Sequence, residues 1–226
     1  MTTQAAQVQK MFGSIARRYD IANHLLSCGM DFYWRRHAAK IVADWRPHSI
    51  ADLATGTGDL ALALQKRLPE AEITGVDFLP EMLEIAKRKG LRQIVLADAT
   101  KLPFGDDSFD CVTIAFGLRN LENWVAGLTE MSRVLKTNGH LLVLEFSLPA
   151  NPLLRSLYRF YLHHCLPLLG SSLTGTRNAY EYLGDSIEEF PNCTVLCQLM
   201  ARNGFALPTF KPLTTGIVTV YTATKP

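Results

Sequence analysis

The sequence predicts an α/β fold in which a mostly parallel, Rossmann-like sheet is covered by helices on both faces. Two observations support this prediction. Between residues 49 and 146, short apolar runs of strand length alternate with segments of helical periodicity. The apolar runs are continuous, which is typical of parallel strands that are buried on both faces.

The expected elements follow one another in a regular order. Strands are predicted at Ser49–Ala54, Glu72–Val76, Gln93–Ala97, Cys111–Ala115 and His140–Phe146. Helices are predicted between them at Asp59–Leu68, Pro80–Lys89 and Asn123–Leu135, with Gly90 and Gly139 at helix-ending positions. Outside this core, we expect a helix at Phe32–Ala43 and two final strands at Phe205–Pro212 and Ile217–Thr224.

Composition limits the class of protein. The chain has 226 residues, of which 48% are hydrophobic and 19% charged, and this suits one globular domain. A net charge of +2 lacks the basic excess of a nucleic-acid binder. The 5 cysteines are scattered without metal-binding spacing, so we expect reduced thiols in a cytoplasmic protein. No run has the length of a secretory leader or a membrane span, so neither is expected.

A glycine loop connects the first predicted strand to the next helix. In the segment DLATGTGDL, Asp52–Leu60, Gly56 and Gly58 let the backbone approach a ligand at the carboxyl end of the strand. Such glycines also occur in tight turns for steric reasons alone. Asp77 closes the following strand, where a carboxylate accepts hydrogen bonds from both hydroxyls of a ribose. The combination favours a nucleoside ligand.

Acidic residues indicate which kind of nucleoside. Asp52 and Asp59 would repel the diphosphate of a dinucleotide, which disfavours a dehydrogenase, but they suit the ammonium and sulfonium groups of S-adenosylmethionine. Asp98 and Ala99 end the third strand, where they would face the adenine, and Ala115 ends the fourth, near the transferred methyl group. Taken alone, each of these three residues would be interpreted as a strand cap or as filler. Their occurrence at successive strand ends predicts an S-adenosylmethionine site.

Further segments resemble the quinone-biosynthesis C-methyltransferases that act on ubiquinone and menaquinone precursors. They are Leu102–Asn120, Arg133–Pro149, Ala179–Pro191, Arg17–Arg36 and Gly204–Lys225, so that the resemblance covers nearly the whole chain. The phrase FGLRN, which ends at Asn120, is much more specific than a generic cofactor loop. The resemblance implies a class I S-adenosylmethionine-dependent methyltransferase with a seven-stranded sheet.

The resemblance also implies a set of cofactor contacts and a reaction. The family's cofactor-binding positions fall on Thr57, Asp77, Asp98, Ala99 and Ala115. Some relatives carry serine at the last of these, so a backbone contact would survive there but a hydroxyl contact would not. The implied reaction moves a methyl group to a ring carbon of a prenylated hydroquinone, either demethylmenaquinol or a ubiquinone-pathway benzoquinol. The ring carbon becomes nucleophilic when a phenolic proton is removed, so no metal is expected.

Arg119 and Asn120 are the residues expected to position the acceptor. They follow the fourth strand, where guanidinium and amide donors would bind a phenolate oxygen or orient a water. The alternative is that Arg119 pairs with an acid such as Glu145 and only fastens the loop. Arginine stays protonated, so it cannot take the phenolic proton. The base is expected to be Asp20 or a water beside Arg119. Tyr19 and Asp20 are expected in a front lid that closes over the acceptor.

An amphipathic helix is predicted after residue 150. Its apolar stripe consists of Leu153, Leu154, Leu157, Tyr158, Tyr161, Leu162, Cys165 and Leu166. Such a stripe packs in the core or against a second subunit, which leaves a homodimer open, or it forms an entrance for a prenyl tail at the inner face of the cytoplasmic membrane. Tyr180 and Tyr182 are further pocket candidates.

We therefore expect one methyltransferase domain in three parts. Residues 1–48 form a helical lid, 49–146 the cofactor-binding core, and 147–226 the substrate-side helices and last two strands. Two alternatives stay open: a class I methyltransferase acting on another small aromatic or lipid acceptor, and a non-catalytic S-adenosylmethionine-binding subunit of a quinone-synthesis complex.

Overall fold

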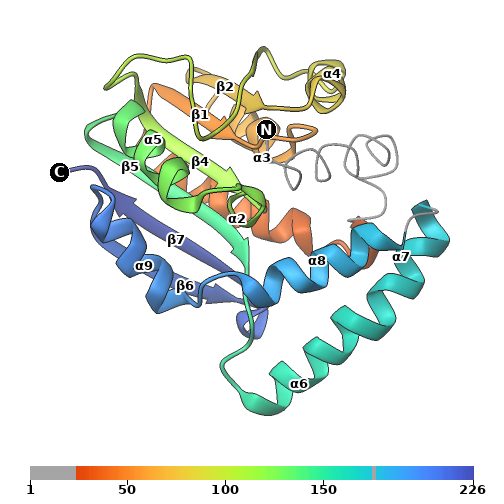
Figure 1. Ribbon diagram of the computed structural model, residues 1–226. Helices are drawn as coiled ribbons and strands as arrows, with labels where there is room; N and C mark the ends of the chain where they lie inside the picture. The colour runs from red at the N-terminus through yellow and green to blue at the C-terminus, as the bar shows by residue number, and fades with distance from the viewer. Residues whose placement is uncertain (1–23, 175–176) are drawn as a thin grey trace.

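A seven-stranded sheet forms the centre of the protein (Figure 1). The computed structural model describes residues 24–174 and 177–226. The strand order is β3-β2-β1-β4-β5-β7-β6, in which β7 runs antiparallel to both of its neighbours and the other pairs are parallel. The strands are β1 Ser49–Leu53, β2 Glu72–Asp77, β3 Gln93–Leu96, β4 Phe109–Ala115, β5 Leu135–Phe146, β6 Ala206–Leu213 and β7 Val218–Thr224. The predicted mostly parallel sheet is confirmed.

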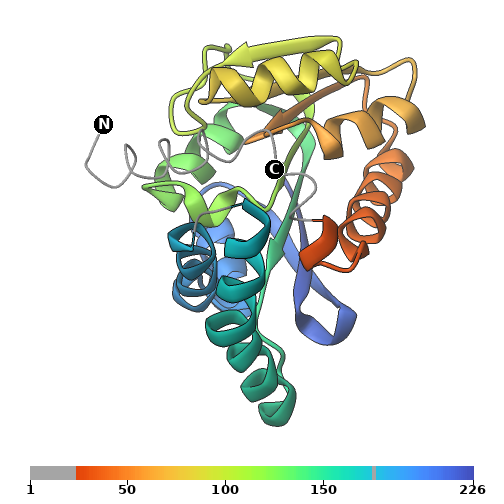
Figure 2. The ribbon, with the colours of Figure 1, turned by 90° about the vertical axis from the view of Figure 1, so that its right-hand side faces the viewer.

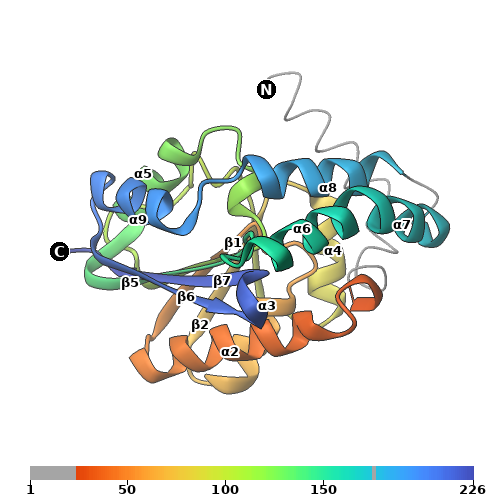
Figure 3. The same cartoon turned by 90° about the horizontal axis from the view of Figure 1, so that it is seen from below.

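Helices cover both faces of this sheet, as Figure 3 shows from below. They are α2 Met30–Trp45, α3 Asp59–Arg67, α4 Pro80–Arg88, α5 Trp124–Val134, α6 Pro152–Phe160, α7 Leu166–Thr174, α8 Asn178–Glu189 and α9 Cys193–Arg202. Short helical turns lie at η1 Leu118–Asn120, η2 Tyr161–Cys165 and η3 Thr214–Gly216. Trp34 of α2 and Leu64 of α3 bury one face of the sheet, and Leu128 of α5 and Leu196 of α9 bury the other.

Local sequence explains where several helices begin. Asn123, Asn151 and Asn192 cap α5, α6 and α9, since each side-chain oxygen accepts a backbone N–H of the first turn. Such a cap contributes about 1 kcal/mol to helix stability. Gly90 follows α4 with a φ of 101°, which confirms its helix-ending position.

The expectation for Gly139 is wrong. Helix α5 ends at Val134 and the chain enters β5 at once, so Gly139 lies inside that strand. A side chain there would place its Cβ 2.7 Å from the carbonyl oxygen of Lys136, and the left-handed residue at this bend is Asn138, with a φ of 62°. The glycine is needed for a close backbone approach and not for a helix cap.

Helices α6 and α7 form one arm that leaves the body of the molecule (Figures 1 and 2). They are joined by η2, a turn of π-helix that ends at Cys165, and Pro167 is the second residue of α7. Proline has no N–H to donate to the preceding turn, and an inserted residue is a common way for a helix to absorb such a defect. In the described parts of the chain, no helix is long and apolar enough to cross a membrane.

The predicted single apolar stripe of this arm is divided in two. Leu162 and Leu166 are buried against α8, with Tyr158 and Tyr161 packed beside them. Leu153 at the outer end of α6 is 70% exposed, and no residue of that helix is fully buried. The stripe therefore serves as core only in its second half, because the first half extends past α8.

Candidate active site

A cavity of about 490 Å³ opens at the carboxyl ends of the parallel strands. It brings together most of the residues that the sequence predicted for the cofactor. Asp52, Gly56, Thr57, Asp77, Asp98, Ala99 and Ala115 line it. Gly58 does not, since it begins α3 with a φ of 85° and a side chain there would press on Ala86 of α4, at 3.1 Å. Its role is to let two helices approach closely.

Asp77 ties the glycine loop to the end of β2. One carboxylate oxygen accepts the backbone N–H of Gly56 at 2.8 Å and the other accepts that of Leu79 at 2.9 Å. Gly56 has a φ of 56°, and a Cβ on it would meet open space, so the bare backbone faces the cavity. A carboxylate offers about four acceptor positions, which leaves two for the hydroxyls of a ribose.

Asp52 lies deeper in the same cavity and is almost completely buried. Its two oxygens accept the hydroxyl protons of Thr113 and Thr55, each at 2.6 Å. Burial raises the pKa of this carboxyl from 3.8 to about 6, although both hydrogen bonds favour the charged form. A nearby cation would return it to the ionised state, and the ammonium group of S-adenosylmethionine is such a cation.

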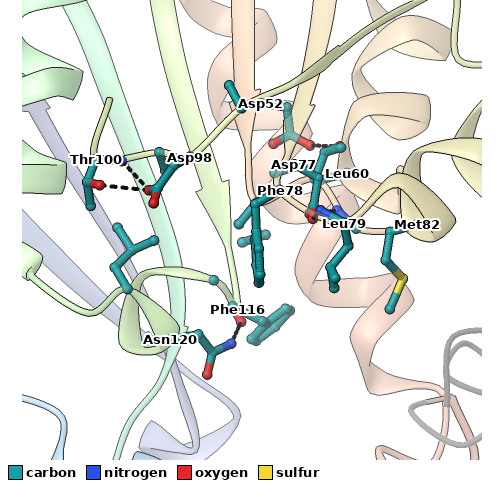
Figure 4. Close-up of a pocket in the computed structure, with 18 of the residues that line it drawn as sticks. Asp52, Leu60, Asp77, Phe78, Leu79, Met82, Asp98, Thr100, Phe116 and Asn120 are labelled. Atoms are coloured by element: carbon teal, nitrogen blue, oxygen red, sulfur yellow. Dashed lines mark hydrogen bonds between the residues drawn. The ribbon is translucent and has the colours of Figure 1, made fainter. Parts of the chain in front are cut away.

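Asp98 lies across the cavity from Asp77 (Figure 4). One of its oxygens accepts both the backbone N–H and the hydroxyl of Thr100, at 2.8 Å each. Phe78, Leu79 and Met82 supply apolar walls on the other side. An apolar slot with a fixed carboxylate at its edge suits a flat base with an exocyclic amino group, so these residues fit the adenine of the predicted cofactor.

A second cavity of about 290 Å³ adjoins the first, since Arg35 and Phe116 line both. Its wall is mostly apolar and aromatic and comes from α2 and the turn before it, the end of β5, α6, η2, α7, α8 and the segments around η1 and η3. Besides Phe116, the aromatic residues of this lining are Trp34, Phe146, Tyr158, Tyr161, Tyr180 and Tyr182. The two tyrosines predicted from the sequence, Tyr180 and Tyr182, are both present. Tyr158 and Tyr161, which the sequence places on the apolar stripe, line the cavity as well.

Arg119 lines this second cavity and is 7% exposed. Its Nη1 donates to Glu145 at 2.7 Å and to the carbonyl of Phe116 at 2.5 Å, so the alternative ion pair exists. Its Nε, however, is buried and has no hydrogen-bond partner within the described residues. A buried donor left unpaired is costly, so an oxygen of a ligand that reached this atom would be bound favourably.

Asn120 turns to the first cavity, where it lies beside Phe116 (Figure 4). Its side-chain oxygen accepts the hydroxyl of Tyr182 at 3.2 Å, which connects the linings of the two cavities. The other two predicted catalytic residues, Tyr19 and Asp20, lie outside the described part of the chain.

The sheet order, with its reversed β7, and the acidic cavity at the strand ends define a class I S-adenosylmethionine-dependent methyltransferase fold. Solved structures of that class share it. A possible histamine N-methyltransferase from Thermotoga maritima superimposes with a TM-score of 0.67 over 96% of this chain and 100% of its own, at 19% identity. Human N-acetylserotonin methyltransferase in complex with S-adenosylmethionine superimposes with a TM-score of 0.66 over 96% of this chain and 58% of its own, at 21% identity.

The chain belongs to the ubiE/COQ5 methyltransferase family, which matches residues 1–225. A demethylmenaquinone methyltransferase of Thermus thermophilus is 46% identical, covering 96% of this chain and 100% of the relative. A demethylmenaquinone methyltransferase of Deinococcus radiodurans is 44% identical, covering 96% of this chain and 92% of the relative. The ubiquinone/menaquinone biosynthesis C-methyltransferase UbiE of a Geobacter species is 42% identical, covering 100% and 99%.

Proposed function

We propose that this protein methylates a ring carbon of a prenylated hydroquinone in quinone biosynthesis, with S-adenosylmethionine as methyl donor. Demethylmenaquinol is the first acceptor to test and the ubiquinone-pathway benzoquinol the second. The observation that carries the proposal is the aromatic second cavity, which adjoins the cofactor cavity and is lined by Arg119, a side chain with an unpaired Nε. The names of the full-length relatives support the same substrate class.

The cofactor fits the first cavity by its charges and shape. Asp77 would hold the ribose, Asp98 the adenine edge, and Asp52 the ammonium group, while Gly56 leaves room for the chain of the amino acid. When bound, S-adenosylmethionine supplies an electrophilic methyl group on a good leaving group. The remaining work falls on the residues around the acceptor.

Arg119 would stabilise the oxygen of the acceptor ring. As the phenolic proton leaves, negative charge develops on that oxygen and passes into the ring carbon. Glu145 holds this guanidinium at the wall of the second cavity, and its Nε–H has no partner among the described residues, so a small shift of the side chain would bring this donor to the acceptor oxygen. The proton would pass to Asp20 or to a water beside Arg119, as expected from the sequence.

Two tyrosine hydroxyls lie near this guanidinium. Burial raises the pKa of Tyr158, and it raises that of Tyr182 against the opposing effect of Arg119. Both side chains therefore stay protonated at neutral pH and do not act as bases. The Tyr158 hydroxyl would donate to a ring oxygen, whereas the Tyr182 hydroxyl already donates to Asn120. Trp34 and Phe146 complete an aromatic enclosure that would exclude water from the carbon nucleophile.

The arm would guide the prenyl tail and hold the protein at the membrane. Tyr158 and Leu162 line the acceptor cavity from the same arm on which Leu153, Leu157 and Phe160 are exposed. A tail that leaves the cavity along this arm would reach those exposed side chains. We therefore include in the proposal a peripheral contact with the inner face of the cytoplasmic membrane.

The test is methyl transfer from isotope-labelled S-adenosylmethionine to a short-chain demethylmenaquinol and to the corresponding benzoquinol under reducing conditions. We expect mass analysis to find the label on a ring carbon of at least one product. If the protein binds S-adenosylmethionine and neither quinol gains a methyl group, the acceptor belongs to another class or the protein is a non-catalytic subunit.

A further inference from the structure

Arg35 lies at the boundary between the two cavities and lines both. Among the described residues of the cofactor cavity, it is the one that carries a basic side chain. The remaining charged residues of that lining are acidic: Asp52, Asp59, Asp77, Asp98 and Glu122. Among the described residues of this lining, Arg35 is therefore the one side chain whose charge attracts an anionic group of a ligand.

The Arg35 guanidinium is fixed from several sides. Its Nη1 donates to Asp31 at 2.6 Å, and its plane lies over the ring of Phe116 at 5.2 Å. Asp31 is itself held by the ring nitrogen of His24 at 2.7 Å and by the hydroxyl of Ser27 at 2.8 Å. The side chain is thus oriented before any ligand arrives.

The rest of the guanidinium is available. Its Nη2 stands 3.8 Å from the nearest oxygen of Asp59, which is too long for a hydrogen bond. Asp59 is paired instead with Lys89. Within the part of the chain that the structure describes, Nη1 carries the hydrogen bond of this guanidinium, so Nη2 and Nε can still donate.

His24, Asp31 and Asp59 also form a cluster that resembles a metal site, because one ligand atom of each lies within 4.8 Å of the others. Arg35 and Lys89 already neutralise the two carboxylates. The cluster is therefore an ion-pair network around Arg35.

We propose that Arg35 binds the carboxylate of the amino acid part of S-adenosylmethionine. This inference rests on the proposed cofactor. S-adenosylmethionine carries two cationic groups, which suit Asp52 and the other acids of the cavity, and one carboxylate, which none of those acids can hold. A guanidinium with two free N–H donors matches a carboxylate in geometry and charge. Arg35 thus distinguishes the intact cofactor from adenosine fragments that lack the amino acid.

The test compares three ligands by isothermal titration calorimetry on Arg35→Met, with Arg36→Met as the control because Arg36 is exposed on the same helix. The ligands are S-adenosylhomocysteine, its analogue without the carboxylate, and 5′-methylthioadenosine, which lacks the whole amino acid. For the unaltered protein and the control, we expect removal of the carboxylate to weaken binding roughly ten- to hundredfold, the range for hydrogen bonds to charged groups.

In Arg35→Met the difference between S-adenosylhomocysteine and its decarboxylated analogue should fall to about twofold or less, while 5′-methylthioadenosine binds as it does to the unaltered protein. Arg35→Lys should keep part of the difference, which guards against a folding defect in the methionine variant. An unchanged difference in Arg35→Met overturns the proposal, and a raised KM for the acceptor alone would assign Arg35 to the acceptor side instead. Failure of the unaltered protein to bind S-adenosylhomocysteine would contradict the proposed cofactor itself.

Discussion

At the scale of single residues, the cofactor cavity depends on two carboxylates, Asp52 and Asp77, that are buried almost completely. Asp52 and Asp77 both have raised pKa values, and burial is the main cause for each. The position of Asp77 was predictable, because the end of a parallel strand is visible as the end of an apolar run, and that of Asp52 because it lies in the last residues of β1, just before the glycine loop. Arg35 and Tyr158 were not assigned to a site, because their side chains reach the cavities only through the packing of distant helices.

Cofactor binding should depend on pH through Asp52. Its pKa of about 6 in the ligand-free protein must fall when the ammonium group binds, so binding releases a proton. The affinity for S-adenosylhomocysteine should rise by up to about tenfold per pH unit below pH ~6 and level off above it. Calorimetry in two buffers of different ionisation enthalpy measures the proton. In the Asp52→Asn variant the affinity should depend much less on pH, because only the contribution of Asp77 remains. A pH dependence as steep as that of the unaltered protein would assign the titration to another group.

The same pKa shift affects stability in the opposite direction. Folding disfavours the ionised form of Asp52, so its contribution to stability is complete below the unfolded pKa of 3.8 and is lost as the pH rises through about 6. The ligand-free Asp52→Asn variant should therefore lose less stability than the unaltered protein between these two pH values. Urea unfolding at several pH values checks this, and parallel curves for the two proteins would contradict it.

Asp77 is expected to matter for both the ribose and the glycine loop. Asp77→Asn keeps the shape but loses one acceptor and the charge, so cofactor affinity should fall roughly ten- to hundredfold. Asp185→Asn, on an exposed part of α8, is the control. Equal calorimetric affinities for the two variants would remove Asp77 from the cofactor site.

Arg119 has a structural and a catalytic part that can be separated. Arg119→Met leaves Glu145 as a buried, unpaired charge, which should cost about 3–5 kcal/mol of stability. Adding Glu145→Leu should restore most of the melting temperature, since it removes that charge. If Arg119 also stabilises the acceptor oxygen, kcat should stay roughly 10²- to 10³-fold low in the double variant. Recovery of activity together with stability would show that the arginine only fastens the loop.

At the scale of elements, the order and type of the core strands and helices followed from apolar runs and helical periodicity. The boundaries moved where tertiary contacts decided them, as at Gly139, which serves a close backbone approach in β5. The arm of α6 and α7 also differs from the prediction, because its apolar stripe is buried in its second half only. Spacing showed which residues share a face of the helix, but not that the body of the protein ends halfway along it.

The exposed end of the arm should bind membranes. We expect the triple variant Leu153→Ser, Leu157→Ser and Phe160→Ser to bind anionic lipid vesicles less than the unaltered protein, because apolar area buried in the interface supplies the affinity. Its KM should rise for a long-tailed quinol but not for a short-chain one. Leu207→Ser, which removes a similarly exposed side chain on β6, is the control. Unchanged vesicle sedimentation together with a change from dimer to monomer would make the arm a subunit contact.

At the scale of the whole molecule, the protein sets two cavities side by side, one acidic and open at the strand ends and the other aromatic and formed by helices of the two flanking parts of the chain. Phe116 and Arg35 form their common wall. The first cavity could be predicted from the sequence because it is built from consecutive strand ends. The second combines residues from α2, the arm and α8, whose meeting depends on the complete fold.

The most direct test of this arrangement is a crystal structure of the protein with S-adenosylhomocysteine and a short-chain demethylmenaquinol. We expect the nucleoside between Asp77 and Asp98, and the quinol ring in the aromatic cavity with one oxygen within hydrogen-bond distance of the Arg119 Nε. A quinol bound elsewhere, with the aromatic cavity closed or filled by protein side chains, would contradict the account.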